Sequence, residues 1–161
     1  MGNRSAHSRD LRKGRYSEAG RIYFVTTSCH SRQRLFEHAR SAQIVIDEFE
    51  RCADVGDCDN LAYVVMPDHI HWLVQLGCDA RLYEIVRKMK GRSARRINLQ
   101  RLLQGKVWQA GFHDYALRTE DEIASFATYL IQNPVRAGLV NDVTDYPYCK
   151  SVWHPGIGCR G

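Results

Sequence analysis

The feature that most constrains the fold is a pair of strand-sized apolar runs joined by a two-residue turn. Residues 61–66 and 69–76 are rich in β-branched and aromatic side chains, and the Pro-Asp pair at 67–68 between them is typical of a tight turn. This pattern predicts an antiparallel β-hairpin. Because strand side chains alternate between faces, His69 and His71 lie on one face of the second strand. The opposite face carries an apolar stripe of Ile70, Trp72, Val74 and Leu76.

Around the hairpin the sequence alternates between strand-like and helix-like patterns. In chain order we expect a strand at 21–27, a helix at 40–52, a turn at 54–60, the hairpin, a helix at 80–103 ended by Gly105, an extended segment at 107–118, a helix after Thr119 limited by Pro134, and an irregular strap at 145–161. Thr119 and Glu122 form the sequence signature of a capping box. The last helix has a core stripe of Ile123, Phe126, Ala127, Leu130 and Ile131.

This order of elements, β, α, β, β, α, β and a further helix, matches a ferredoxin-like α+β sandwich with an antiparallel sheet. Two helices then cover one face of the sheet and leave the second face free for ligands. The length of 161 residues is that of one domain, so we expect a single domain spanning 1–161, with a basic N-terminal tail at 1–20.

The composition excludes several classes of protein. No stretch approaches the roughly 20 apolar residues of a membrane span. Residues 1–15 are polar and basic and lack the apolar core of a secretory signal, so we expect a cytoplasmic protein without a membrane partner. Six cysteines include no Cys-x-x-Cys pair, which favours scattered, reduced thiols over a zinc or redox site.

Positive charge is concentrated in the second predicted helix. The net charge is +5, and the segment from Arg81 to Lys106 holds nine basic residues against one acid, Glu84. A cluster of this kind indicates a polyanionic partner, although a solvated surface explains it equally well. The candidate phosphate contacts are Arg87, Lys88, Lys90, Arg92, Arg95 and Arg96. Exposed aromatic residues could stack on unpaired bases or simply pack in the core, and the candidates are Trp108, Phe112 and Tyr115.

Two constellations carry candidate chemistry. His69 and His71 are about 7 Å apart along one face of a strand, close enough for both imidazoles to reach one metal ion. Tyr129 and Asn133 share one helical face at spacing i, i+4. A tyrosine can attack a phosphodiester when a bound divalent cation offsets the phosphate charge, and an amide oxygen would complete a site suited to Mg or Mn. With the basic helix nearby, this set of residues fits a site that cuts DNA strands.

The segment Met66-Pro-Asp-His-Ile-His-Trp-Leu73 resembles the His-hydrophobe-His (HUH) motif of single-tyrosine transposases. Residues 129–140, Tyr-Leu-Ile-Gln-Asn-Pro-Val-Arg-Ala-Gly-Leu-Val, resemble the tyrosine helix of one branch, the REP-associated tyrosine transposases. Weaker similarities are Tyr23-Phe-Val-Thr26, Trp108-Gln-Ala-Gly-Phe-His-Asp114 with Leu117-Arg118, and Asp145-Tyr-Pro147.

The resemblance implies that His69 and His71 bind the metal and that Tyr129 is the nucleophile of a 5′-phosphotyrosine intermediate. Asn133 would be the third ligand or would organise the metal site. Related insertion-sequence transposases usually have Gln four residues after the tyrosine, whereas this chain has Asn133 there and Gln132 one place earlier. The implied partner is a single-stranded DNA hairpin, commonly of repeated extragenic palindromes, in the bacterial nucleoid. No small-molecule substrate is implied.

Two functions therefore compete. One is a metal-dependent single-stranded DNA endonuclease and strand transferase. The other is a non-catalytic binder of single-stranded DNA or RNA hairpins on the same scaffold. Only the first explains why histidines, tyrosine and amide occur together. The sequence leaves open Mg versus Mn, monomer versus homodimer, and whether Tyr129 serves its own chain or a partner's.

Overall fold

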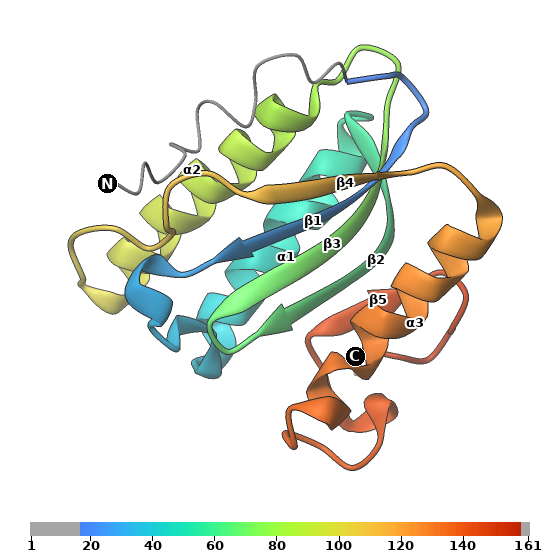
Figure 1. The fold of residues 1–161 in the computed structure, drawn as a ribbon. Helices are drawn as coiled ribbons and strands as arrows, with labels where there is room; N and C mark the ends of the chain where they lie inside the picture. Colours follow the sequence, from blue (N-terminus) through green and yellow to red (C-terminus); the bar gives the residue numbers. More distant parts are fainter. Residues whose placement is uncertain (1–16, 159–161) are drawn as a thin grey trace, which may run out of the picture.

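The computed structural model describes residues 17–158 (Figure 1). Its elements, in chain order, are β1 (Ile22–Ser28), η2 (His30–Arg32), η3 (Leu35–Glu37), α1 (Ala39–Asp54), β2 (Cys58–Met66), β3 (His69–Leu76), α2 (Leu82–Arg101), β4 (His113–Leu117), α3 (Glu120–Arg136), η4 (Val143–Asp145) and β5 (Cys149–Ser151). Most of the predicted basic tail lies outside the described residues. No helix within 17–158 combines the length and the hydropathy that a membrane-spanning segment requires.

The sheet has the order β4-β1-β3-β2-β5, and each neighbouring pair is antiparallel. The predicted hairpin forms its centre, with Met66 of β2 opposite His69 of β3. β1 pairs with the other edge of β3, which places Thr26 opposite His71 and Ser28 opposite His69. The first four strands have the arrangement expected of the ferredoxin-like α+β sandwich, so the predicted fold class is confirmed.

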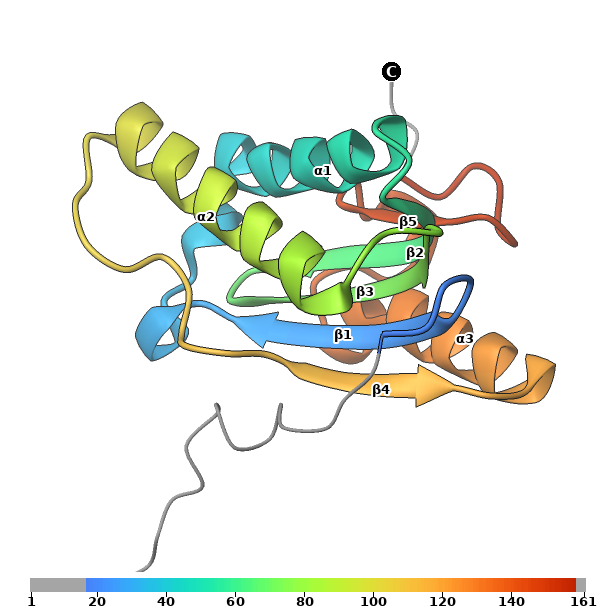
Figure 2. The same ribbon diagram turned by 90° about the horizontal axis from the view of Figure 1, so that it is seen from above.

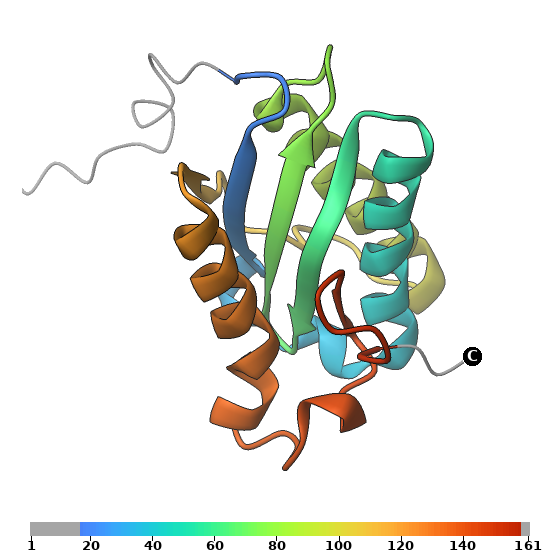
Figure 3. The same cartoon turned by 90° about the vertical axis from the view of Figure 1, so that its right-hand side faces the viewer.

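The sheet lies between two layers of helix (Figures 2 and 3). α1 and α2 cover the face that carries Ile70, Trp72 and Val74, and these residues belong to the larger apolar cluster. α3 lies across the opposite face, where Leu130 and Leu73 belong to a second apolar cluster. The expectation that this second face is free was therefore wrong. The apolar stripe of α3 needs a surface to cover, and the sheet supplies it.

A buried polar network joins the hairpin to α1. The Trp72 indole N–H donates to Asn60 Oδ1 at 2.8 Å, and Asn60 Nδ2 donates to the carbonyl oxygen of Phe49 at 2.9 Å. Trp72 and Phe49 are fully buried and their ring centroids are 4.7 Å apart. Because each buried polar atom in this network has a partner, the network fixes the relation of β2, β3 and α1 without leaving an unpaired group.

Several predicted boundaries were wrong. β2 begins at Cys58, inside the expected turn, and α2 ends at Arg101 rather than at Leu103 because Leu102 adopts a left-handed backbone with φ 53°. Only residues 113–117 of the expected extended segment form a strand. The segment expected to be an irregular strap contains the short strand β5. This strand pairs with β2, where Ser151 lies opposite Ala62 and Cys149 lies opposite Val64.

α3 begins as predicted and ends later than predicted. The Thr119 hydroxyl accepts a hydrogen bond from the Glu122 backbone N–H, and the Glu122 carboxylate accepts one from the Thr119 backbone N–H, so the capping box is formed. Pro134 does not limit the helix, which continues to Arg136. A proline deprives the carbonyl four residues earlier of its donor. Here that carbonyl belongs to Leu130, and the Asn133 side chain donates to it at 3.4 Å.

Candidate active site

The two histidines lie together at the start of β3, on the face of the sheet that α3 crosses. Their ring centroids are 4.9 Å apart. His69 Nδ1 donates to Asp68 Oδ1 at 2.7 Å, and His71 Nδ1 is 2.7 Å from Thr26 Oγ1. Each ring is therefore held through its Nδ1 atom, which orients its Nε2 atom for another partner.

Burial and charge keep His71 neutral. His71 is 7% exposed. Burial first, and then the positive charges of His69, Arg136 and Arg32, lower the pKa of His71 from 6.5 to about 3. A neutral imidazole is the form that binds a metal ion. Asp68 stays ionised: burial raises its pKa, but the hydrogen bond and charge of His69 and the charge of Arg32 lower it overall.

Tyr129 approaches the histidines from α3 of the same chain. The centroid of its ring is 5.8 Å from that of His71 and 6.2 Å from that of Phe24. The tyrosine is 42% exposed, so its hydroxyl can be reached by a large ligand. His71 and Tyr129, which are 58 positions apart in the sequence, thus come together because the apolar side of α3 packs on the sheet.

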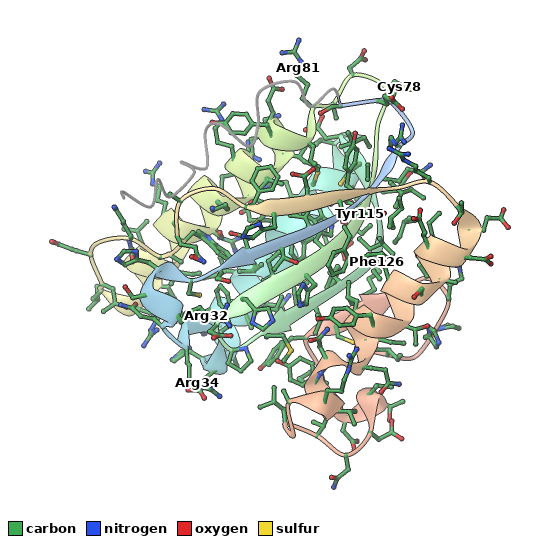
Figure 4. The ribbon with its side chains drawn as sticks, in the orientation of Figure 1. Arg32, Arg34, Cys78, Arg81, Tyr115 and Phe126 are labelled. Atoms are coloured by element: carbon green, nitrogen blue, oxygen red, sulfur yellow. The ribbon has the colours of Figure 1, made fainter. Side chains whose placement is uncertain are left out.

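Arginines surround this point. Arg136 Cζ lies 4.4 Å from the centroid of the Tyr129 ring, and its Nη2 donates to the Tyr129 carbonyl oxygen at 3.0 Å. Arg32 is bound to Asp68, with Nε and Oδ2 3.0 Å apart, and to the Ser28 hydroxyl. In Figure 4 the side chains of Arg32 and Arg34 lie near the end of β1.

Asn133 lies one turn after Tyr129 and is half-buried. Its Nδ2 atom donates to the carbonyl oxygens of Tyr129 and Leu130 at 3.0 and 3.4 Å. Since both partners are acceptors, the amide nitrogen faces the helix and the amide oxygen is left for another ligand. The alternative residue, Gln132, is exposed on the same helix.

The side chains at this point fit a divalent cation. Two imidazoles present unused Nε2 atoms, their Nδ1 atoms are fixed by a hydroxyl and a carboxylate, and an amide oxygen lies on the neighbouring helix. In the part of the chain from 17 to 158, no group of three or more His, Cys, Asp or Glu side chains is placed to hold a metal. A site built from these residues would be completed by an amide or by water.

The basic helix does not lie beside the histidines, because α2 covers the other face of the sheet. Three of its six candidate phosphate contacts are engaged within the chain. Lys88 Nζ is 3.2 Å from Asp57 Oδ2, Lys90 Nζ donates to the Gln109 carbonyl oxygen at 2.7 Å, and Arg96 binds Asp47 and Glu48 at 2.7 and 3.1 Å. The other three are exposed and are Arg87, Arg92 and Arg95.

The three candidate stacking residues have different environments. Trp108 is buried and its indole N–H donates to the Ser93 hydroxyl at 3.0 Å, while Phe112 packs against the larger core cluster. Tyr115 is half-exposed and stacks on Phe126, with ring centroids 5.5 Å apart and an angle of 18° between the planes (Figure 4). Of the three, Tyr115 is the most exposed residue.

Residue-by-residue reasoning did not assign the groups that orient the site. Thr26 and Asp68 hold the imidazoles, and Arg136 packs on the tyrosine. The position of Asp68 directly before His69 is a signal that could have identified it. Thr26 and Arg136 could be identified only once strand register and side-chain direction were known.

The sequence places the chain in a family of transposases. The family model described as "Transposase IS200 like" matches residues 20–133, and the chain belongs to this family. Within it, the chain is 28% identical over 159 residues to a Haemophilus influenzae protein that carries the provisional name of REP-associated tyrosine transposase, covering 89% of this chain and 84% of that protein. It is 29% identical over 98 residues to the REP-associated tyrosine transposase of Escherichia coli K12, covering 60% and 54% of the two chains.

A solved structure supports the fold. The structure of a REP-associated tyrosine transposase bound to a REP hairpin superposes with a TM-score of 0.70 at 24% identity, covering 84% of this chain and 79% of that one. The predicted resemblance to the REP-associated tyrosine transposases is thus confirmed.

Proposed function

We propose that the protein is a metal-dependent single-stranded DNA endonuclease and strand transferase that uses Tyr129 as its nucleophile. One observation carries this proposal: His69 and His71, each held through Nδ1, meet an exposed tyrosine supplied by a helix distant in sequence. A histidine pair on a solvated sheet face would need neither the two fixed Nδ1 atoms nor the tyrosine.

In the proposed reaction the Tyr129 hydroxyl oxygen attacks the scissile phosphorus. The bond from phosphorus to the 3′ oxygen breaks, which leaves a 5′-phosphotyrosine link and a free 3′ hydroxyl. His69 and His71 would hold a divalent cation, Mg or Mn, with Asn133 as the third protein ligand. Bound there, the cation would offset negative charge on the phosphate oxygens. Thr26 and Asp68 keep the imidazoles in place.

The proposed substrate is a DNA hairpin with a single-stranded foot, as in repeated extragenic palindromes. The binding of a REP hairpin by the structural relative supports this choice. The exposed arginines of α2, Arg87, Arg92 and Arg95, would contact the phosphates of a hairpin that extends around the sheet. The proposed setting is the bacterial nucleoid in the cytoplasm, with the protein acting as a monomer or homodimer.

The test is formation of a covalent protein–DNA adduct. The protein is incubated with labelled single-stranded hairpins and Mg or Mn, and the products are separated on a denaturing gel. We expect an adduct that disappears on addition of a chelator and with Tyr129→Phe. The matched control is Tyr115→Phe, which removes a phenol hydroxyl from another exposed tyrosine on β4 and should leave the adduct in place.

Two results would contradict the proposal. An adduct that persists with Tyr129→Phe would show that another residue is the nucleophile. Tight, salt-sensitive hairpin binding without an adduct under either metal would instead identify a non-catalytic binder of DNA or RNA hairpins.

A further inference from the structure

Arg136 is a cation directly beside the candidate nucleophile. It is the last residue of α3, two helical turns after Tyr129, and its side chain extends back along the helix. The guanidinium lies over the Tyr129 ring at 4.4 Å and donates from Nη2 to the Tyr129 carbonyl oxygen at 3.0 Å. Two contacts thus hold the charged group in one place, so it is ordered before any ligand arrives.

No carboxylate within residues 17–158 forms an ion pair with Arg136, although other arginines at this end of the sheet are paired. Arg32 binds Asp68, and Arg34 binds Glu37 with Nε and Oε1 2.7 Å apart. Their charges are largely compensated. The positive charge of Arg136 also acts on His71, where it helps to lower the imidazole pKa. Arg136 therefore places an uncompensated positive charge directly over the tyrosine ring.

The chemistry of the guanidinium selects the ligand. Arginine has five N–H donors in a planar fork that matches two oxygens of a phosphate. The bond to the Tyr129 carbonyl uses only Nη2, and the other N–H donors of Arg136 form no hydrogen bond with residues 17–158. Attack by a tyrosine oxygen increases the negative charge on the two non-bridging oxygens of a phosphodiester, and a fixed donor at that position stabilises the charge.

We propose that Arg136 binds the non-bridging oxygens of the scissile phosphate beside Tyr129. This role depends on the proposed nuclease activity and adds to it a phosphate-binding residue. In the step, one bond forms between the phenol oxygen and phosphorus and one breaks to the 3′ oxygen. The phenol proton leaves to solvent, the 3′ oxygen takes up a proton, and Arg136 stays protonated throughout.

A simpler role for Arg136 is to compensate the dipole at the end of α3, where positive side chains are favoured. The experiment must therefore measure how the effect of Arg136 on the rate depends on the charge of the scissile phosphate. A methylphosphonate at the scissile position replaces one non-bridging oxygen by a methyl group and removes the negative charge. If Arg136 neutralises the phosphate, it no longer increases the rate on this uncharged substrate. If it only supports the helix or the tyrosine ring, its replacement slows both substrates by the same factor.

The rate of adduct formation is measured in single turnovers, with the normal hairpin and with its methylphosphonate form. The proteins are the wild type, Arg136→Gln and Arg136→Lys. Arg118→Gln is the matched control, because Arg118 is an exposed arginine that lies before the start of α3, at the opposite end of this helix from Arg136. Circular dichroism and thermal melting establish that each variant is folded, and hairpin affinity is measured by titration.

On the normal hairpin we expect Arg136→Gln to slow adduct formation about a hundred- to a thousandfold, as for loss of one donor at a developing oxyanion. Arg136→Lys should be intermediate, and Arg118→Gln should react like the wild type. On the methylphosphonate the wild type and Arg136→Gln should react at nearly the same rate. Hairpin affinity should change little, because one phosphate contact is lost among many.

Two outcomes would overturn the proposal, and they are distinguishable. If the wild type forms the adduct but Arg136→Gln slows both substrates by the same factor, Arg136 acts through the helix or the ring and binds no phosphate. If the wild type binds the hairpin and forms no adduct, the proposed nuclease function is wrong, and the proposed role of Arg136 in that reaction is wrong as well.

Discussion

Thr26→Val isolates the hydrogen bond that orients His71. Thr26 Oγ1 lies 2.7 Å from His71 Nδ1, and valine has nearly the same shape without the hydroxyl. His71 is 7% exposed, so water has little access to replace the lost partner. Removing the partner that fixes a metal-binding histidine typically lowers metal affinity by about 10- to 100-fold, which corresponds to about 1.4–2.7 kcal/mol. An unpaired buried nitrogen also costs about 1–3 kcal/mol of stability.

The matched control is Thr27→Val, the same change on the next residue of β1. Thr27 points to the opposite face, and its hydroxyl is 3.4 Å from the Gly111 carbonyl oxygen, away from the histidines. Manganese titration calorimetry and urea unfolding are measured on both variants. Thr26→Val should bind Mn at least about tenfold more weakly than Thr27→Val. Equal affinities for the two variants would refute the assignment of His71 as an oriented metal ligand.

Three further predictions concern pH, α3 and α2. The unfolded chain protonates His71 below about pH 6.5 and the folded chain only near 3, so the folded state loses up to about 1.4 kcal/mol per pH unit as pH falls through this window. In urea unfolding, the free energy of unfolding of His71→Gln should fall less than that of the wild type as the pH is lowered through this window. Equal losses in the two proteins would contradict the low pKa of His71. Thr119→Ala removes the capping box and should lower the free energy of unfolding by about 1 kcal/mol, while a change near zero would mean that α3 does not depend on its cap. Combined replacement of Arg87, Arg92 and Arg95 by Gln should reduce the slope of log K against log salt for hairpin binding by about 0.9 per lost phosphate contact; an unchanged slope would exclude this helix as the phosphate-binding surface.

The local pattern of the chain predicted the elements of the site well. Alternation along β3 placed His69 and His71 on one face, and the spacing of Tyr129 and Asn133 placed both on one side of a helix. These inferences succeed because the two-residue period of a strand and the 3.6-residue period of a helix are properties of the backbone itself. The capping box at Thr119 was predictable for the same reason, since its hydrogen bonds join residues three positions apart.

Predictions about ends and neighbours were less successful. Pro134 was expected to limit the last helix, yet the Asn133 amide supplies a donor to the carbonyl that proline leaves unpaired, and the helix continues. The basic residues of α2 were expected near the histidines but lie across the sheet from them. In both cases the deciding contacts involve side-chain direction or packing that a one-dimensional pattern does not contain.

The sequence by itself therefore determined the order of most strands and helices and which face each side chain takes within its own element, but not where each element ends. Tertiary structure alone decided that α3 packs on the histidine face of the sheet, that Tyr129 meets His71 within one chain, and that Arg136 lies over the tyrosine. The physical reason is that periodicity comes from local backbone geometry. Which face of the sheet a helix packs on depends instead on burying apolar surface between segments that are far apart in the chain.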